Sequence, residues 1–299
     1  MTTAPGRARR LAVLGSPISH SMSPRLHRAA YDVLGLDWNY EAVEIAGGGL
    51  GEFVSTRTRD WLGLSLTMPL KHDIRPFLSQ HDELSMLTGS TNTVLLTIEE
   101  GVPARLGFNT DVGGIVRALA ARGVTSAHDV VILGGGATAA SALVAAAQLG
   151  AAHASVIVRT PQRAEPLREI AHRSGLDLTI APLTTASLDD AAGSLTLSTL
   201  PGGAAPVDVV GGSSLPGRSA LLDVAYHPWP SPLAALWNAE GRPAISGIDM
   251  LVHQALLQIR IFVGHDPSIP LADERRVLAA MFASVAETEP APGTSTGIS

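Results

Sequence analysis

The sequence contains no cysteine, and this absence excludes disulfides, thiolate metal ligands and thiol nucleophiles. Charged residues make up only 16% of the 299 residues, and aromatic residues only 4%. Lysine and arginine number 21 against 27 aspartates and glutamates, which gives a net charge of −6, and the basic residues do not cluster. The charge pattern therefore argues against nucleic-acid and membrane-surface partners, and any catalysis must use groups other than thiols.

Long apolar runs are also absent. No stretch of about 18 apolar residues is present, and residues 1–10 lack the apolar segment of a signal peptide, so we expect a cytoplasmic protein. None of the ten histidines forms the motif H-E-x-x-H, and no metal site is predicted. Residues 289–299 are rich in proline, glycine, serine and threonine, which predicts a disordered tail.

What is present is an alternation of apolar, strand-like runs with helical patterns. The first series has strand-like runs at 11–15, 40–43, 61–67 and 93–98, helical patterns at 24–34 and 50–58, and a turn at 99–101. The second has runs at 130–133, 154–158, 176–180, 195–198 and 220–224, and helical patterns at 247–263 and 273–285 follow it. Such alternation favours parallel sheets flanked by helices, which defines an α/β protein.

A glycine-rich turn opens the second series. The apolar run Val130–Leu133 leads into Gly134, Gly136 and Ala139, which form the pattern G-x-G-x-x-A at the start of an alanine-rich helix. In this context the first glycine allows a tight turn, the second lets the backbone approach a pyrophosphate, and the small third residue lets the helix pack on the strand. Because free N–H groups at the helix start would face phosphates, the sequence predicts a dinucleotide site.

The next strand ends in two arginines. Arg159 and Arg163 flank Thr160 at the position where NAD-binding proteins carry a carboxylate for the ribose 2′-OH. Guanidinium groups make forked contacts with phosphate, so the sequence favours NADP over NAD as the cofactor. The alternative is that both arginines are simply solvated at the end of a strand.

Polar residues also follow the apolar runs of the first series. They lie in the serine-rich loop 15–24 and in the stretches 66–71, 89–93 and 107–111, with a similar stretch at 226–228. Open α/β sheets place ligand groups at the ends of strands, and hydroxyl, amide, ammonium and carboxylate groups together suit a small polyhydroxylated acid. Each stretch also has an explanation that involves no ligand. For example, Lys71 would be an ordinary surface lysine, and Asp111 would be the N-cap of the helix that follows.

Together these stretches resemble the shikimate dehydrogenase family. The resemblance rests on seven elements that occur in the family's order and cover most of the chain. They are G-x-P-I-x-H-S-x-S-P at 15–24, T-x-P-x-K at 67–71, N-T at 92–93, N-T-D at 109–111, the glycine turn at 134, R-T-x-x-R at 159–163 and G-x-x-M-L-V-x-Q at 247–254. The resemblance implies the reversible, NADPH-dependent reduction of 3-dehydroshikimate to shikimate.

The resemblance also implies a two-domain α/β fold with the active site in the cleft between the domains. Residues 1–110 plus 247–288 would form the substrate-binding domain, and residues 111–246 a Rossmann-like NADP-binding domain. Besides NADP, the protein would bind a small-molecule substrate, shikimate or 3-dehydroshikimate. No nucleic acid or membrane is expected as a partner. The sequence leaves the oligomeric state open, with a homodimer as one option.

Carried over residue by residue, the resemblance assigns Lys71 and Asp111 to a catalytic pair at the reacting oxygen. The substrate-binding residues would be Ser21, Ser23 and Tyr226 at the carboxylate, and Thr67, Asn92 and Gln254 at the ring hydroxyls. The cofactor-binding residues would be Gly134, Gly135, Gly136, Ala137, Arg159, Thr160, Arg163, Thr199, Val224, Gly247 and Met250. An ammonium beside a ketone oxygen can stabilise the charge that hydride transfer creates there or can supply a proton, and both roles stay open for Lys71.

The sequence departs from the family pattern at four positions. Phe108 replaces a carboxylate, Ser65 an asparagine, Ala137 a glycine and Val158 an asparagine, whereas Lys71 and Asp111 are intact. Two other functions stay open at this point. One is a quinate or quinate/shikimate dehydrogenase of the same superfamily, and the other is a dinucleotide-binding regulatory protein without turnover.

Overall fold

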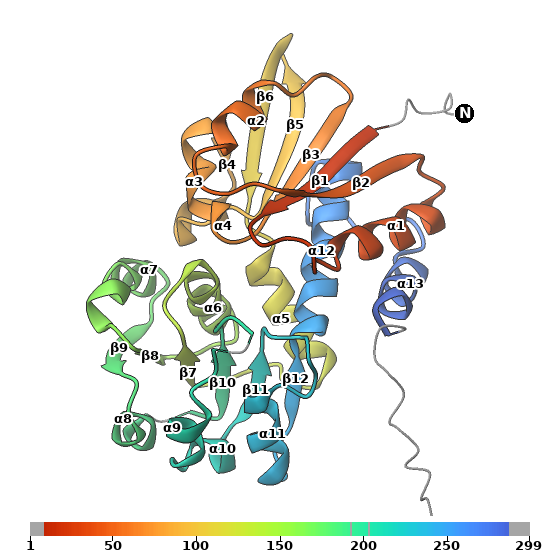
Figure 1. The fold of residues 1–299 in the computed structure, drawn as a ribbon. Coiled ribbons are helices and arrows are strands. Elements are labelled where there is room, and N and C mark those ends of the chain that lie inside the picture. Colours follow the sequence, from red (N-terminus) through yellow and green to blue (C-terminus); the bar gives the residue numbers. More distant parts are fainter. Residues whose placement is uncertain (1–8, 192, 203, 287–299) are drawn as a thin grey trace, which may run out of the picture.

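The structure, a computed structural model, describes residues 9–191, 193–202 and 204–286. Two six-stranded sheets form two halves that are joined by the long helices α5 and α12 (Figure 1). None of the helices in these residues is long and apolar enough to cross a membrane. The tail predicted at 289–299 lies outside the described residues.

The first sheet has the strand order β2-β1-β3-β5-β6-β4. Its strands are β1 (Arg9–Gly15), β2 (Trp38–Glu44), β3 (Trp61–Leu66), β4 (Gln80–His81), β5 (Thr93–Glu99) and β6 (Val102–Phe108). β1 pairs in parallel with β2 and β3, whereas β5 is antiparallel to both β3 and β6. The expected parallel pairing holds for β1, β2 and β3, whereas β5 and β6 pair antiparallel because the chain reverses at the predicted turn 99–101 in a hairpin.

Helices cover both faces of the first sheet. They are α1 (Ser23–Leu34), α2 (Leu50–Ser55), α3 (Leu70–Asp73), α4 (Glu83–Thr88) and α13 (Glu274–Ala286), with a 3-10 turn at Arg75–Phe77. α1 packs against α13 and α12 over one face, where Leu11, Leu26 and Phe262 are buried. On the other face Leu14, Leu64 and Leu70 form a separate buried cluster.

The second sheet is parallel throughout, with the strand order β12-β11-β10-β7-β8-β9. Its strands are β7 (Asp129–Leu133), β8 (His153–Val158), β9 (Asp177–Pro182), β10 (Leu195–Ser198), β11 (Ala220–Asp223) and β12 (Ala244–Ser246). This is the strand order of the dinucleotide-binding fold, in which the direction of winding changes between the first and fourth strands, here β7 and β10. A ligand crevice is expected at that point of the sheet.

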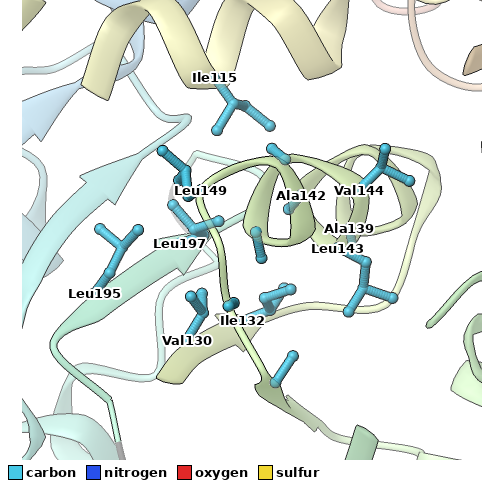
Figure 2. Packing of buried hydrophobic residues seen from close by; sticks show 14 of the residues in the cluster. Ile115, Val130, Ile132, Ala139, Ala142, Leu143, Val144, Leu149, Leu195 and Leu197 are labelled. Atoms are coloured by element: carbon cyan, nitrogen blue, oxygen red, sulfur yellow. The ribbon is translucent and has the colours of Figure 1, made fainter. Parts of the chain in front are cut away.

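Helices and one 3-10 turn connect these strands. They are α6 (Ala137–Gln148), the turn Pro161–Ala164, α7 (Leu167–Arg173), α8 (Thr185–Asp190), α9 (Val207–Gly211), α10 (Leu215–Arg218) and α11 (Pro232–Ala239). Figure 2 shows Ala139, Ala142 and Leu143 of α6 packed over Val130 and Ile132 of β7. The alanines are fully buried, and their small side chains let α6 lie close to the sheet directly after the glycine turn.

The helices α5 (Asp111–Ala121) and α12 (Gly247–Gly264) run along each other between the two sheets (Figure 1). Glycines permit this contact, because a Cβ atom at Gly113 would lie 2.6 Å from Leu257 Cδ1 and one at Gly114 would lie 2.7 Å from Gln254 Cβ. Both helices therefore bring their first turns to the space between the sheets. The domain boundaries 1–110 plus 247–288 and 111–246 stay a prediction.

Candidate active site

A cavity of about 300 Å³ lies between the two halves at the ends of β1, β3 and β5. All eight residues that the resemblance assigned to substrate binding and catalysis line it. They are Ser21, Ser23, Thr67, Lys71, Asn92, Asp111, Tyr226 and Gln254. The structure therefore brings together side chains that are separated by more than two hundred positions in the sequence.

The loop after β1 and the loop after β3 are held in close contact. A Cβ atom at Gly15 would lie 2.4 Å from Thr67 Cγ2 and 2.9 Å from the carbonyl oxygen of Met68, so only glycine allows this approach. The backbone N–H of Thr67 donates to the carbonyl oxygen of Leu14 at 2.9 Å. On the other side of the first loop, the N–H of Ser23 donates to Ser21 Oγ at 3.3 Å. These contacts fix the serine hydroxyls and Thr67 on one wall of the cavity.

Lys71 and Asp111 form the central ion pair of the cavity. Lys71 is the only lysine in the sequence, and its Nζ lies 2.5 Å from Asp111 Oδ2. The side chains are 13% and 4% exposed. Asp111 is the first residue of α5 but does not cap it, because Asn109 Oδ1 accepts the backbone N–H groups of Asp111 and Val112 at 2.9 and 3.4 Å. The N-cap alternative for Asp111 was therefore wrong, and its carboxylate faces the lysine instead.

Amide side chains hold the other carboxylate oxygen. Asn92 is 1% exposed, and its Nδ2 donates to Asp111 Oδ1 at 2.7 Å and to Gln254 Oε1 at 3.4 Å. Asn92 Oδ1 in turn accepts the backbone N–H of Thr110 at 2.9 Å. The start of β5 and the start of α5 are thereby tied together at the carboxylate, which pre-organises the Lys71–Asp111 pair.

A second cavity, of about 630 Å³, lies over the turn between β7 and α6. Its lining includes eight of the predicted cofactor residues, which are Gly134, Gly135, Gly136, Ala137, Arg159, Thr160, Arg163 and Thr199. Thr67 and Lys71 line this cavity as well as the first one. The two cavities therefore share a wall at the proposed catalytic lysine.

The glycine turn makes the floor of the second cavity. Gly134 has a φ of +110°, and a Cβ atom there would lie 2.5 Å from Thr199 Oγ1, so both the backbone angle and the space require glycine. A Cβ atom at Gly136 would meet no atom within 4 Å. Gly136 borders the open cavity directly before the first turn of α6, where free N–H groups and the helix dipole favour an anion.

The charge of the second cavity suits the same class of ligand. Its cationic lining residues are Lys71, Arg159 and Arg163, and the lining contains no carboxylate. Within the described ranges, neither arginine forms an ion pair with an acidic side chain. Two unpaired guanidinium groups at the end of β8 are available to a phosphate.

Three predicted cofactor residues lie on the substrate side. Val224, Gly247 and Met250 line the first cavity and not the second. A Cβ atom at Gly247 would lie 2.1 Å from the carbonyl oxygen of Val224, so α12 can begin this close to the end of β11 only with glycine. Their contact with a nicotinamide ring stays a prediction.

Burial shifts the pKa of Tyr226, which lines the first cavity, and that of Asp82, which contacts the segment before Asp111. It raises the pKa of the Tyr226 hydroxyl, which therefore stays protonated as a hydrogen-bond donor. Burial also raises the pKa of Asp82 to about 6, against the opposing effect of hydrogen bonds from the backbone N–H groups of Ser85 and Asn109. Asp82 thus contacts the segment that leads into Asp111.

Sequence reasoning missed Gln258 and Thr138, which also line the first cavity. Gln258 lies four residues after Gln254 on α12, so helical spacing could have indicated it. Thr138 lies in the first turn of α6 and has no such signal. Of the departures from the family pattern, Ser65 lines the first cavity and Val158 the second, whereas Phe108 lines neither and packs against the core of the first half.

The fold and the two cavities define a class of protein. A Rossmann-type sheet with a glycine turn and a cationic crevice, next to a cavity of hydroxyl, amide and carboxylate groups, is typical of nicotinamide-dependent dehydrogenases of small polar substrates. The Lys71–Asp111 pair, at the wall that both cavities share, is the natural place for proton chemistry.

Comparisons with known proteins identify the family. A family model described as the shikimate dehydrogenase substrate binding domain matches residues 13–94. The shikimate dehydrogenase (NADP(+)) of Microcystis aeruginosa is 33% identical over 94% of this chain and 100% of its own length. The chain belongs to the shikimate dehydrogenase family.

Solved structures agree with this assignment. The crystal structure of a shikimate 5-dehydrogenase from Mycobacterium fortuitum is 36% identical, covers 93% of this chain and 99% of its own, and gives a TM-score of 0.77. A shikimate 5-dehydrogenase from Thermus thermophilus, solved in complex with NADP(H) and shikimate, is 28% identical, covers 93% of this chain and 100% of its own, and gives a TM-score of 0.76.

Proposed function

We propose that this protein catalyses the reversible, NADPH-dependent reduction of 3-dehydroshikimate to shikimate. The observation that carries the proposal is the position of Lys71, which lines both the polar cavity and the cavity over the glycine turn and pairs with Asp111 at 2.5 Å. Membership of the family and the activity for which its relatives are named support the same reaction.

The polar cavity supplies the groups that such a substrate needs. Ser21, Ser23 and Tyr226 would offer hydroxyl donors to the substrate carboxylate. Thr67, Asn92 and Gln254 offer hydroxyl and amide groups to the ring hydroxyls. All of these residues line the one cavity of about 300 Å³. Because each is fixed on a strand end, a helix or a loop with close contacts, the substrate would be oriented without a large rearrangement of the site.

The residues of the second cavity fit NADPH. The open space beside Gly136 and the start of α6 would hold the pyrophosphate, and Arg159, Thr160 and Arg163 the 2′-phosphate. When bound, the cofactor supplies the hydride that reaches the ketone carbon. The Lys71 ammonium would stabilise the charge on the ketone oxygen or give it a proton, and Asp111 would keep the ammonium beside that oxygen.

An assay of the purified protein tests this function. Shikimate and quinate would each be offered with NADP⁺ and with NAD⁺, and the formation of reduced cofactor followed by absorbance. Fast reduction only with shikimate and NADP⁺ is expected. Preference for quinate or for NAD⁺ would assign the protein to the quinate branch of the superfamily. No turnover with any pair, in a protein that still binds NADP⁺, would identify a binding protein without this activity.

The remaining expectations about the environment of the protein rest on composition alone. A cytoplasmic location, the absence of nucleic-acid and membrane partners, and a homodimer as one option stay predictions. Sedimentation of the purified protein at several concentrations would measure its oligomeric state.

A further inference from the structure

A chain of buried hydrogen bonds begins at β2 and runs under the substrate cavity. The Tyr40 hydroxyl donates to Ser65 Oγ at 2.7 Å, and the Ser65 hydroxyl donates to Gln258 Oε1 at 2.9 Å. Gln258 Nε2 then donates to Thr93 Oγ1 at 3.0 Å. Tyr40, Ser65, Thr93 and Gln258 have no part in the proposed function as described so far.

The chain continues to the catalytic carboxylate. The Thr93 hydroxyl donates to Asn92 Oδ1 at 2.9 Å, and Asn92 Nδ2 donates to Asp111 Oδ1 at 2.7 Å. Every donor from Tyr40 onward points in the same direction, toward Asp111. Hydrogen bonds that run in one direction polarise one another and are coupled in their geometry. The orientation of the Asp111 carboxylate thus depends on groups that contact neither substrate nor cofactor.

Gln258 is the link whose orientation is fixed most completely. Its Oε1 accepts from Ser65 and from His27 Nε2, the latter at 3.3 Å, and its Nε2 also donates to the carbonyl oxygen of Asn92 at 3.3 Å. Burial lowers the pKa of His27 to about 3, so the ring is neutral. With Nε2 as its donor, His27 Nδ1 accepts from the Tyr31 hydroxyl at 3.0 Å. A flipped Gln258 amide would place Oε1 against the carbonyl oxygen of Asn92, an acceptor against an acceptor.

Burial makes this arrangement costly to break. Gln258 is 1% exposed, Ser65 3% and Thr93 0%. A donor or acceptor left unpaired in such surroundings loses its full hydration. Ser65 also stands where the family pattern carries an asparagine, and it lines the cavity together with Gln258. In this chain an amide from α12, that of Gln258, lies directly beside the serine on β3 and accepts its hydroxyl at 2.9 Å.

We propose that Gln258 is a positioning residue, which joins β3 to β5 beneath the substrate and sets, through Thr93 and Asn92, the direction of the Asp111 carboxylate toward Lys71. Gln258 acts through other residues and is not itself catalytic. The expected effects on kcat rest on the proposed function. The orientation of Asp111 toward Lys71 can be tested without it.

A matched pair of threonine variants tests the link. Thr93→Val removes the hydroxyl between Gln258 and Asn92, and Thr196→Val removes an equally buried strand hydroxyl from the second sheet, where it contacts Ser219 Oγ at 2.8 Å. Thr93→Val is expected to lower kcat ~10-fold with the KM for NADP⁺ changed less than ~2-fold, because misplacement of a catalytic group affects the chemical step. Equal kcat values for the two variants would overturn the proposal.

A rescue experiment tests the replacement of the amide. Gln258→Ala is expected to lower kcat at least as far as Thr93→Val, and the double variant Ser65→Asn with Gln258→Ala is expected to recover part of that loss. A purely structural role of Gln258 would not be repaired by an asparagine on β3. If the double variant has a native circular dichroism spectrum but does not recover kcat, the positioning role of the Gln258 amide is refuted. If Gln258→Ala does not fold, Thr93→Val still tests the link between Gln258 and Asn92.

One readout does not depend on turnover. Since Lys71 is the only lysine, the rate at which acetic anhydride modifies its side-chain amine can be followed by mass spectrometry of the peptide that contains it. Thr93→Val is expected to speed this reaction, because a displaced Asp111 no longer holds the ammonium, and Thr196→Val is expected to leave it unchanged. Unchanged rates in both would refute the inference. An inactive wild-type protein would instead refute the proposed function.

Discussion

The two cavities that meet at Lys71 are built in opposite ways. The substrate cavity is lined by side chains from the loops after β1 and β3, from Asn92 directly before β5, and from α5 and α12, and its polar groups are tied to one another by buried hydrogen bonds. The cofactor cavity depends on the backbone of one turn, 134–137, and on the start of α6, with two exposed arginines at its edge.

This difference predicts how each half responds to substitution. In the first half the identity of each side chain matters, because a buried polar network has no spare partners. In the second half the backbone geometry matters most, because a parallel apolar sheet presents a turn and a helix start to the ligand. Substitutions that separate side-chain from backbone effects therefore test the comparison.

The largest effect is expected from Lys71→Ala, which removes the ammonium at the wall shared by the cavities. Turnover should fall by ~100-fold or more while NADPH binding changes little, because the groups that would hold the phosphates are Gly136, Arg159 and Arg163. Asp73→Ala, an exposed residue of the same short helix outside both cavities, is the control. Stopped-flow turnover and fluorescence titration of NADPH measure the two quantities, and near-normal turnover would remove Lys71 from the mechanism.

Backbone dependence of the second half is tested by Gly134→Ala against Gly150→Ala. Both glycines have a positive φ, +110° and +83°, but only at Gly134 would the new Cβ atom meet a neighbour, Thr199 Oγ1 at 2.5 Å. Each variant should lose ~1 kcal/mol of stability from the backbone strain. NADP⁺ binding should weaken ~30-fold in Gly134→Ala alone, because a shifted turn misplaces its N–H groups. Isothermal titration with equal affinities for both variants would contradict the account.

A smaller, selective effect is expected from Arg159→Ala. The dissociation constant for NADPH should rise ~10-fold while that for NADH stays within ~2-fold, because in the proposed function the guanidinium would contact only the 2′-phosphate. Arg168→Ala provides the comparison, since Arg168 is exposed, pairs with Glu165 and lies outside the cavity. If both cofactors bind more weakly to the same extent, Arg159 does not read the 2′-phosphate.

The pH dependence of stability probes the first half without any ligand. Burial lowers the pKa of His27 from 6.5 to about 3, so below pH 6.5 only the unfolded chain takes up this proton. The stability that this group contributes is thus present above pH 6.5 and is lost as the pH falls. Between pH 7.5 and 5 the wild type should lose ~2 kcal/mol relative to His27→Gln in urea unfolding. A pH-independent difference would show that His27 titrates normally.

Much of the site could be predicted because its residues stand in contiguous motifs. The glycine turn, the arginines after β8 and Lys71 each follow a recognisable apolar run, and Asp111 stands in the motif N-T-D at 109–111. The long helix 247–263 and most strands of the second sheet were also expected within one or two residues. Local sequence determines such features, since a strand, its turn and the following helix are neighbours in the chain.

The features that escaped prediction depend on contacts between distant segments. The hydrogen bond from Ser65 to Gln258 joins residues 193 positions apart, and no local pattern indicates such a pair. β6 was missed because its residues 102–108 include a proline, an arginine and a glycine and show no continuous apolar run. Antiparallel pairing of β5 with β3 is likewise decided by tertiary packing, not by local composition.

The most direct test of the central claim, that the reaction occurs at Lys71 where the cavities meet, is the turnover of protein acetylated at its single lysine. Acetylation removes the charge without a mutation, and mass spectrometry reports its extent at this one side chain. Turnover of shikimate with NADP⁺ should fall in proportion to the acetylated fraction, and both ligands together should slow the modification. Full turnover by completely acetylated protein would contradict the account.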